Sequence, residues 1–268
     1  MENGTGSITN TLFSDLRALA FLSKTMPHIC NDKKAAELSE KLPQQYFDIS
    51  GEDELSIIYK GAKADQIDFN VRRFLAQNPS GIIAVLGAGL GTAYYRNDTG
   101  GNIWYEIDQP EIISLRNTVF GQQDRDQYLA YSPFSKDWYS TVKANGRPVL
   151  FIAAGLLCNY TEDRAVDLMK DLSSFPNAEI IFEAPSRSGK EIMKKCLYGS
   201  ESADTSQLLA VDDPVQLVRK IGNNARVVSF DDLFGIILDR KGLSLGTKYS
   251  MMISNMLNRV EFVHLKLS

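Results

Sequence analysis

The stretch that most constrains the fold of this chain is residues 82–92, which read IIAVLGAGLGT. The first five residues are apolar and mostly β-branched, a pattern typical of a strand that is buried on both faces of a parallel sheet. The glycine-rich segment that follows lets the backbone turn sharply and lets a ligand approach without meeting a Cβ atom. A helix is expected next, with the free N–H groups of its first turn facing the ligand.

The spacing of these glycines separates two classes of ligand. Dinucleotide enzymes favour G-x-G-x-x-G, which places pyrophosphate at the helix N-terminus. Here the third glycine, Gly91, comes one residue early, and Thr92 stands where the dinucleotide pattern has glycine. The shorter spacing is typical of enzymes that bind S-adenosylmethionine (SAM). By itself the motif also fits a purely structural turn.

An acidic residue follows at the expected distance. Residues 102–107 are predicted to form the second strand, and Asp108 ends it 17 positions after Gly91. An acid at this place in such a fold can accept hydrogen bonds from both ribose hydroxyls, so we expect Asp108 to bind an adenosine ligand. A helix N-cap for the segment after Pro110 is the alternative role, and the two roles could coexist.

Composition narrows the class of protein. At 268 residues the chain can form one large α/β domain with an elaboration, or two small domains. The net charge is −4 and basic residues do not cluster, which argues against a nucleic-acid partner. No apolar run reaches the ~18 residues that span a bilayer, and the polar N-terminus lacks a signal-peptide core. We therefore expect a cytoplasmic protein without a membrane partner; the sequence does not indicate an oligomeric state.

Cysteine and histidine usage excludes several kinds of site. Cys30, Cys158 and Cys196 show no C-x-x-C spacing, which suits a reducing compartment rather than a disulfide framework. His28 and His264 are the only histidines and lie far apart in the sequence. A histidine-rich metal site and a Ser-His-Asp triad are therefore not expected.

Hydrophobic periodicity predicts a helical region followed by a doubly wound sheet. Residues 1–78 are expected to form a helical cover, with a third helix over about 54–77 that Gly61 could interrupt. Residues 79–268 are expected to form a Rossmann-like domain, because strands and helices alternate from residue 82 onward. The expected strands are 82–86, 102–107, 127–131, 148–153 and 178–183, and the expected helices are 90–96, 111–120, 135–144 and 162–172.

The last third of the chain departs from this alternation. Residues 188–224 are expected to be a mostly helical insertion beside the substrate. Residues 226–230 and 259–267 are expected to be strands, and their hairpin-like relationship predicts that the last strand is antiparallel. This feature is typical of SAM methyltransferases and distinguishes them from standard dinucleotide folds.

Several ordered motifs resemble one family. They are VLGAGLGTAYYR, WYEIDQPEII, YSPFSKDWYSTV, PVLFIAAGLLCNYTEDRAVDLM and FPNAEIIFEAPSRSG. In this order they resemble the leucine carboxyl methyltransferase family, especially its polyketide O-methyltransferase branch, whose members are similar to tetracenomycin carboxyl methyltransferase. The resemblance covers roughly residues 10–240. It implies a class I SAM methyltransferase fold with a helical N-terminal cover.

The resemblance also implies where SAM binds. Gly87, Ala88 and Gly89 would pass near its methionine part, and Asp108 would hold the ribose. Gln109, next to Asp108, is a further candidate for cofactor binding. The family's arginine for the SAM carboxylate falls on Lys63, which keeps the charge but loses the bidentate fork. A solvated helix lysine is the alternative interpretation of Lys63.

At several positions the chain departs from the family pattern. The family usually reads G-A-G-L-D-T-R, and this chain has Gly91 and Ala93 in place of the aspartate and the arginine. Ser132 and Pro133 replace an Asp-Leu pair near the adenine. Ala154, followed by Gly155, replaces a glutamate after the fourth strand. Two acidic contacts to adenosine are therefore missing.

We thus expect a SAM-dependent O-methyltransferase that methylates a small-molecule carboxylate or phenol without a metal and releases S-adenosylhomocysteine. Tyr160 and Arg187 follow the fourth and fifth strands, at the edge where ligands bind, and are candidates for substrate contact. One alternative is a non-catalytic SAM-fold binding protein, suggested by the missing acids. Another is a nicotinamide-dependent oxidoreductase, which Thr92 and the antiparallel last strand disfavour.

Overall fold

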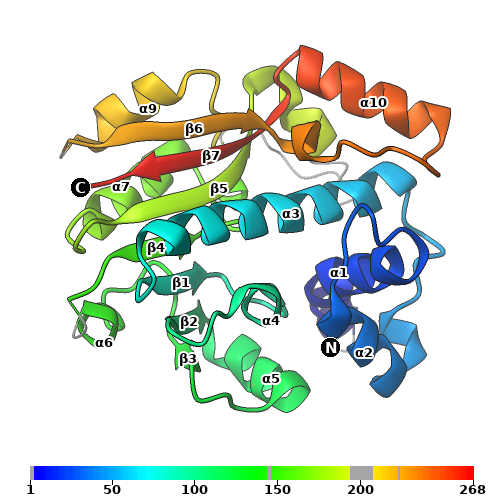
Figure 1. Ribbon diagram of the computed structural model, residues 1–268, viewed down its shortest axis with the longest axis horizontal. Helices are drawn as coiled ribbons and strands as arrows, with labels where there is room; N and C mark the ends of the chain where they lie inside the picture. Colours follow the sequence, from blue (N-terminus) through cyan, green and yellow to red (C-terminus); the bar gives the residue numbers. More distant parts are fainter. Residues whose placement is uncertain (1–2, 144–145, 194–207, 223) are drawn as a thin grey trace.

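The computed structural model describes residues 3–143, 146–193, 208–222 and 224–268. Within them the chain forms a seven-stranded sheet in the order β3-β2-β1-β4-β5-β7-β6 (Figure 1). The strands are β1 (Ile82–Leu86), β2 (Ile103–Asp108), β3 (Asp126–Ala130), β4 (Val149–Ile152), β5 (Glu179–Pro185), β6 (Arg226–Asp232) and β7 (Val260–Lys266). The first five strands run parallel, and β7 runs antiparallel between β5 and β6. The doubly wound α/β fold and the antiparallel last strand are confirmed.

The sheet separates two hydrophobic cores. Alternate residues of β1 point to opposite faces, so Ile83 packs in the core beneath α3 while Ile82 and Ala84 pack in the core beneath α7. All three side chains are fully buried. Burial on both faces explains why this strand reads as a continuous apolar run.

Helices cover both faces of the sheet (Figure 1). Those that follow β1 are α4 (Ala93–Asn97), α5 (Pro110–Phe120), α6 (Tyr139–Lys143), α7 (Glu162–Leu172), α9 (Pro214–Ile221) and α10 (Leu245–Met256). Short 3₁₀ turns are η1 (Gln44–Tyr46), η2 (Leu157–Asn159), η3 (Arg187–Gly189) and η4 (Leu233–Ile236).

Three helices precede the sheet: α1 (Asn3–Thr25), α2 (Lys33–Lys41) and α3 (Glu54–Gln77). Gly61 does not interrupt α3. A Cβ atom at Gly61 would lie 2.6 Å from Cδ1 of Leu22, so the missing side chain lets α1 approach α3 closely. In this position glycine serves tertiary packing, which outweighs its low helix propensity.

Two helix boundaries differ from the expectation. Helix α4 begins at Ala93 rather than at residue 90, because Gly91 closes a turn onto the carbonyl of Ala88 at 3.0 Å. Helix α6 begins only at Tyr139, because the preceding segment forms a turn in which Ser135 donates to Asp137 at 2.5 Å. Such local side-chain bonds compete with the helix.

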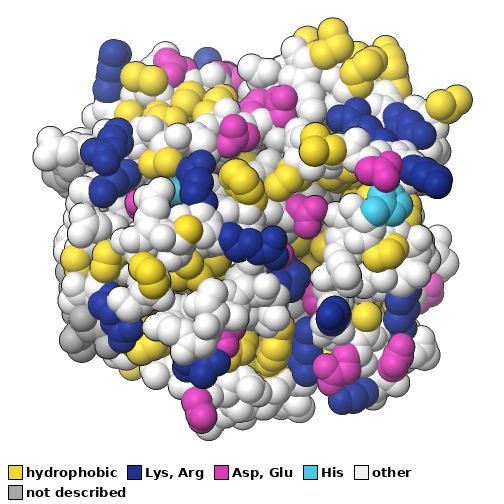
Figure 2. Space-filling model, in the orientation of Figure 1, with side chains coloured by type: hydrophobic (Ala, Val, Ile, Leu, Met, Phe, Trp, Pro, Cys, Tyr) yellow, Lys and Arg dark blue, Asp and Glu magenta, His cyan; other side chains and the backbone are white. Residues whose placement is uncertain are grey.

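Part of the expected insertion over 188–224 lies outside the described residues, as does Cys196. The described remainder contains η3 and α9. Figure 2 shows acidic and basic side chains interspersed over the visible face. In the described part of the chain, no helix is both long and apolar enough to cross a membrane, and no group of three or more metal-ligating side chains was found there.

Candidate functional site

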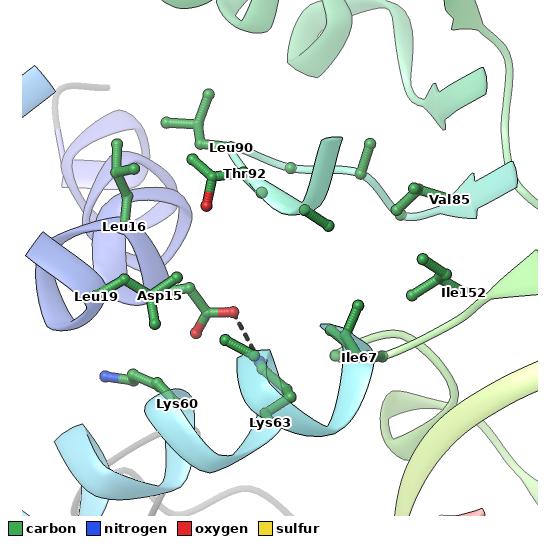
Figure 3. Close-up of a pocket in the computed structure, with 18 of the residues that line it drawn as sticks. Asp15, Leu16, Leu19, Lys60, Lys63, Ile67, Val85, Leu90, Thr92 and Ile152 are labelled. Carbon is green, nitrogen blue, oxygen red and sulfur yellow. Dashed lines mark hydrogen bonds and ion pairs between the residues drawn. The ribbon is translucent and has the colours of Figure 1, made fainter. Parts of the chain in front are cut away.

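A cavity of about 260 Å³ opens at the carboxyl ends of β1 and β4, where the sheet faces α1 and α3 (Figure 3). This is the edge at which open α/β sheets bind ligands. The residues that line it on the helices are Leu12, Ser14, Asp15, Leu16, Leu19, Lys60, Lys63, Ala64, Ile67, Ala93 and Arg96. Those that line it on strands and turns are Val85, Gly87, Ala88, Gly89, Leu90, Gly91, Thr92, Ile152, Ala154, Gly155 and Asn159.

The glycine turn after β1 has two glycines with positive φ, Gly87 at +71° and Gly89 at +48°. A Cβ atom at Gly87 would lie 3.1 Å from Cδ1 of Leu156, whereas one at Gly89 would meet nothing within 4 Å. The positive φ and the close contact with Leu156 together explain why glycine is required at position 87. The open space beside Gly89 is where a ligand can approach the backbone.

Arg116 of α5 supports this turn. Its guanidinium donates to the carbonyl of Gly89 at 3.2 Å and to that of Gly91 at 2.8 Å, and it pairs with Glu106 of β2 at 2.9 Å. The side chain is fully buried. This residue was not predicted as part of the site. Its spacing from Ile113 and Phe120, which places all three on the buried face of α5, could have indicated that it is buried.

Asp108 is bonded to the turn from the end of β2. Its Oδ2 accepts a hydrogen bond from the N–H of Gly89 at 2.9 Å, and its Oδ1 accepts one from the N–H of Gln109 at 2.7 Å. Burial raises the pKa of Asp108 above its ordinary value. Gln109 is the N-cap residue of α5 and makes no side-chain cap bond, so the N-cap alternative for Asp108 is wrong. Both carboxylate oxygens can accept further hydrogen bonds.

Lys63 lies in the cavity rather than on a solvated helix face. Its side chain is only 7% exposed, and its Nζ lies 2.7 Å from Oδ2 of Asp15. A Cβ atom at Gly155 would lie 3.6 Å from the same Nζ. Burial lowers the pKa of Lys63, but the carboxylates of Asp15 and Glu183 outweigh burial and hold it above its ordinary value.

Glu183 of β5 completes the surroundings of Lys63. Its Oε1 accepts hydrogen bonds from the N–H of Gly155 at 2.7 Å and from the hydroxyl of Tyr59 at 3.3 Å. Its Oε2 is buried without a hydrogen-bond partner among the described residues. Burial raises the pKa of Glu183. Glu183 was not predicted as a neighbour of Lys63, because 120 positions separate the two residues in sequence.

The remaining predicted residues fall into two groups. Ala88, Ala154 and Gly155 line the cavity, whereas Gln109, Ser132 and Pro133 do not. The Oγ of Ser132 accepts a hydrogen bond from the N–H of Phe134 at 3.3 Å.

The two candidate substrate residues lie outside the cavity. Tyr160 packs on Phe134, with 4.4 Å between ring centroids, and lies under the guanidinium of Arg164. Arg187 is exposed and pairs with Asp212 at 3.3 Å. The structure therefore does not bring these two side chains together with Lys63.

Comparison with known proteins identifies the family of this chain. The sequence profile of the leucine carboxyl methyltransferase family matches residues 5–173, which is more than half of the chain. The chain belongs to the leucine carboxyl methyltransferase family.

One protein of similar sequence is the tetracenomycin polyketide synthesis O-methyltransferase TcmP of Streptomyces glaucescens. It is 25% identical over 181 residues, which cover 66% of this chain and 66% of TcmP. A protein of Mycobacterium sp. (strain KMS), provisionally named a SAM-dependent methyltransferase, is 27% identical over 150 residues, covering 50% of this chain and 49% of that protein. The chain thus matches between about half and two thirds of the length of these relatives.

The fold has counterparts among solved structures. A protein of Thermobifida fusca YX, provisionally described as a methyltransferase, superposes with a TM-score of 0.56 at 12% identity, covering 95% of this chain and 93% of that one. At this identity the likeness concerns the fold alone.

An arginine lies near the position at which the glycine motif of this chain lacks the family's arginine. Ala93 stands where the leucine carboxyl methyltransferase family usually has arginine, and Arg96 lies about one helical turn later and lines the cavity. Its guanidinium donates to Asp32 of the α2 N-terminus at 2.5 Å and to Asp68 of α3 at 2.8 Å. This side chain therefore ties α2, α3 and α4 together beside the glycine turn.

Proposed function

We propose that this protein is a SAM-dependent O-methyltransferase that acts on a small-molecule carboxylate or phenol. The observation that carries the proposal is the shared cavity. It places the open backbone of Gly89 and the buried ammonium of Lys63 at the carboxyl edge of a sheet in a chain of the leucine carboxyl methyltransferase family. SAM carries a carboxylate, which the ammonium of Lys63 can bind, and the open backbone of Gly89 leaves room for the rest of the ligand.

The proposed contacts follow the geometry. Lys63 would bind the SAM carboxylate, and the backbone of Gly87–Gly89 would pass beside the methionine part together with Ala154 and Gly155. Asp108 would accept from the ribose hydroxyls while its bonds to Gly89 and Gln109 hold it in place. Ser132 and Pro133 would lie toward the adenine.

The same proposal assigns roles to the parts of the chain. Residues 1–78 would cover the cavity, since α1 and α3 both line it, and residues 79–268 would hold SAM. The described parts of residues 188–224 would lie on the substrate side. Contacts of Tyr160 and Arg187 with substrate require an acceptor that extends beyond the cavity.

For methyl transfer from SAM, the main task of the protein would be to position the acceptor. SAM supplies a methyl group that its sulfonium charge already activates. His264 is engaged by Glu179 at 2.7 Å and by Asn70 at 3.0 Å, and His28 contacts the carbonyl of Lys241. Neither histidine lines the cavity, so an acceptor that ionises by itself is favoured. Orienting such an oxygen in line with the methyl group is then the main catalytic contribution.

A turnover assay tests this proposal. The full chain is incubated with methyl-labelled SAM and a panel of aromatic and aliphatic carboxylates, phenols, alcohols and amines, with and without a chelator. We expect label in carboxylates or phenols, a rate that rises as the acceptor ionises, and no effect of the chelator. Exclusive methylation of amines or weakly acidic alcohols, or a metal requirement, would contradict the mechanism.

One alternative is favoured by specific residues. Ser132 and Ala154 lack the acids that the family usually places around adenosine, and Gly91 lacks the aspartate of the glycine motif. These departures would suit a non-catalytic SAM-binding protein. SAM binding without label transfer to any acceptor would support that alternative. A nicotinamide oxidoreductase is disfavoured by the glycine spacing and by the antiparallel β7. We also propose a cytoplasmic protein with a small-molecule partner, and neither a nucleic-acid nor a membrane partner.

A further inference from the structure

A carboxylate from the N-terminal helix lies beside the lysine of the cavity. Asp15 of α1 and Lys63 of α3 point toward each other across the cavity (Figure 3), and Oδ2 of Asp15 lies 2.7 Å from Nζ of Lys63. The Asp15 side chain remains 45% exposed, although the lysine is only 7% exposed. The lysine is thus enclosed while part of the carboxylate stays accessible.

The other cations of the cavity have separate partners. Lys60 pairs with Glu52, and Arg96 pairs with Asp32 and Asp68. None of these acids lines the cavity. Asp15 is the one acidic side chain among the described residues that does. With the charges of Lys60 and Arg96 already paired to these acids, the cavity presents the remaining cation, Lys63, beside one anion, Asp15. This is a poor arrangement for binding an anion alone.

We infer that Asp15 and Lys63 together form a site for an α-amino acid zwitterion, in which Asp15 binds the α-ammonium and Lys63 binds the α-carboxylate of SAM. The inference rests on the proposed function. An α-amino acid carries its two charges on one carbon, so both can reach a pair whose own charges lie 2.7 Å apart. Each of the four charged groups then has a neighbour of opposite sign.

The acceptor capacity of Asp15 supports this role. The hydrogen bond to Lys63 uses Oδ2, and an ionised carboxylate has about four lone-pair sites. An ammonium can therefore bind without displacing Lys63. Hydrogen bonds between such charged groups are stronger than neutral ones, and the burial of Lys63 reduces competition from water at its end of the pair.

The test compares ligands that differ only at the amino group. Calorimetric titrations of the full chain use S-adenosylhomocysteine and its analogue without the α-amino group, with wild type, Asp15→Asn and Asp15→Glu. In wild type we expect the parent compound to bind about 10- to 100-fold more tightly, a range typical of a charged hydrogen bond. In Asp15→Asn this preference should fall below about threefold, and Asp15→Glu should restore part of it.

The inference is judged by the ratio of the two affinities, S-adenosylhomocysteine over its analogue without the α-amino group. The affinity for either ligand alone is not decisive, because removing the charge of Asp15 also frees Lys63 to bind any carboxylate. Asp167→Asn is the matched control, since Asp167 is an exposed helix aspartate that pairs with Lys170; it should keep the wild-type preference. Thermal unfolding identifies a variant that fails to fold, and the remaining variant at position 15 then decides.

Three results separate the inference from its alternatives. An unchanged preference in Asp15→Asn would overturn it, because the ammonium would then bind elsewhere. Tighter binding of both ligands with an unchanged preference would also overturn it and would make Asp15 a competitor for Lys63. Absence of binding by either ligand to wild type would instead contradict the proposed function.

Discussion

The N–H of Gly89 donates a hydrogen bond to Oδ2 of Asp108 at 2.9 Å, which joins the turn after β1 to the end of β2. The two residues are 19 positions apart in sequence, and each is a proposed SAM contact. Their bond means that the glycine turn and the ribose acid form one unit. The carboxylate is held in position before any ligand arrives.

Replacing Asp108 should weaken SAM binding strongly. Asp108→Ala removes a charged acceptor for the ribose hydroxyls, and it also frees the N–H of Gly89. A charged hydrogen bond contributes ~1.5–3 kcal/mol, or about 10- to 150-fold in affinity. Calorimetry with SAM measures the change. Glu111→Ala, which removes another acid near the start of α5, serves as the control, and equal affinities for both variants would refute the ribose assignment.

A methyl group at Gly89 should block the ligand more than it harms the fold. The added Cβ of Gly89→Ala would meet no protein atom within 4 Å, but φ is +48°. The strain of a left-handed residue is ~1–2 kcal/mol. Gly100→Ala is the matched control, since Gly100 also has positive φ and open space but does not line the cavity. We expect similar small losses of stability and loss of SAM affinity only at position 89; parallel affinities would make the turn structural only.

Lys63 should matter for both stability and binding. Lys63→Ala leaves the buried Glu183 without its nearby cation, so we expect a loss of ~2–4 kcal/mol of folding free energy besides at least tenfold weaker SAM binding. Lys63→Arg keeps the charge and offers a bidentate fork, so it should preserve affinity. Denaturant unfolding and calorimetry separate the two effects. Unchanged SAM affinity in a folded Lys63→Ala variant would rule out the carboxylate contact.

Glu261 on β7 should make stability depend on pH. Burial, together with the charges of Asp232 and Asp231, raises its pKa from 4.5 to about 7, and its Oε1 lacks a hydrogen-bond partner among the described residues. The folded protein keeps this proton while the unfolded chain releases it. The contribution of Glu261 is therefore fully present below about pH 4.5 and is lost as pH rises toward 7.

Glu261→Gln should remove this dependence. We expect the fall in unfolding free energy between pH 5 and 7 to be smaller in the variant by ~1–3 kcal/mol, at ~1.4 kcal/mol per pKa unit. Denaturant unfolding at several pH values measures it. Parallel pH profiles for wild type and variant would show that Glu261 titrates normally.

Local sequence patterns predicted those features of the fold that are determined by residues close together in the sequence. The apolar run before Gly87 identified β1, and the hairpin-like last third of the chain predicted that β7 is antiparallel. The place of Asp108 at the end of β2 was predicted correctly from the second apolar run, and its role toward a ligand stays a prediction. Gly61 was misjudged as a potential break, because its reason lies in Leu22 of another helix.

Ion pairs between distant segments were not predictable in this way. Asp15 and Lys63 are 48 positions apart, and nothing around Asp15 in sequence indicates that it faces a lysine. Arg116 bonds to carbonyl groups 25 and 27 positions away. Arg116 was not singled out from the sequence, and its burial with these bonds shows that it supports the turn.

The most direct test of the proposed SAM site is calorimetric titration of the full wild-type chain with SAM and with S-adenosylhomocysteine, run beside Asp108→Ala and Gly89→Ala. We predict saturable binding of both ligands at one site per chain, and binding weakened at least tenfold in each variant while thermal unfolding shows that the variants are folded. Absence of heat and of any thermal shift with either ligand in wild type, or binding that both variants retain unchanged, would contradict it.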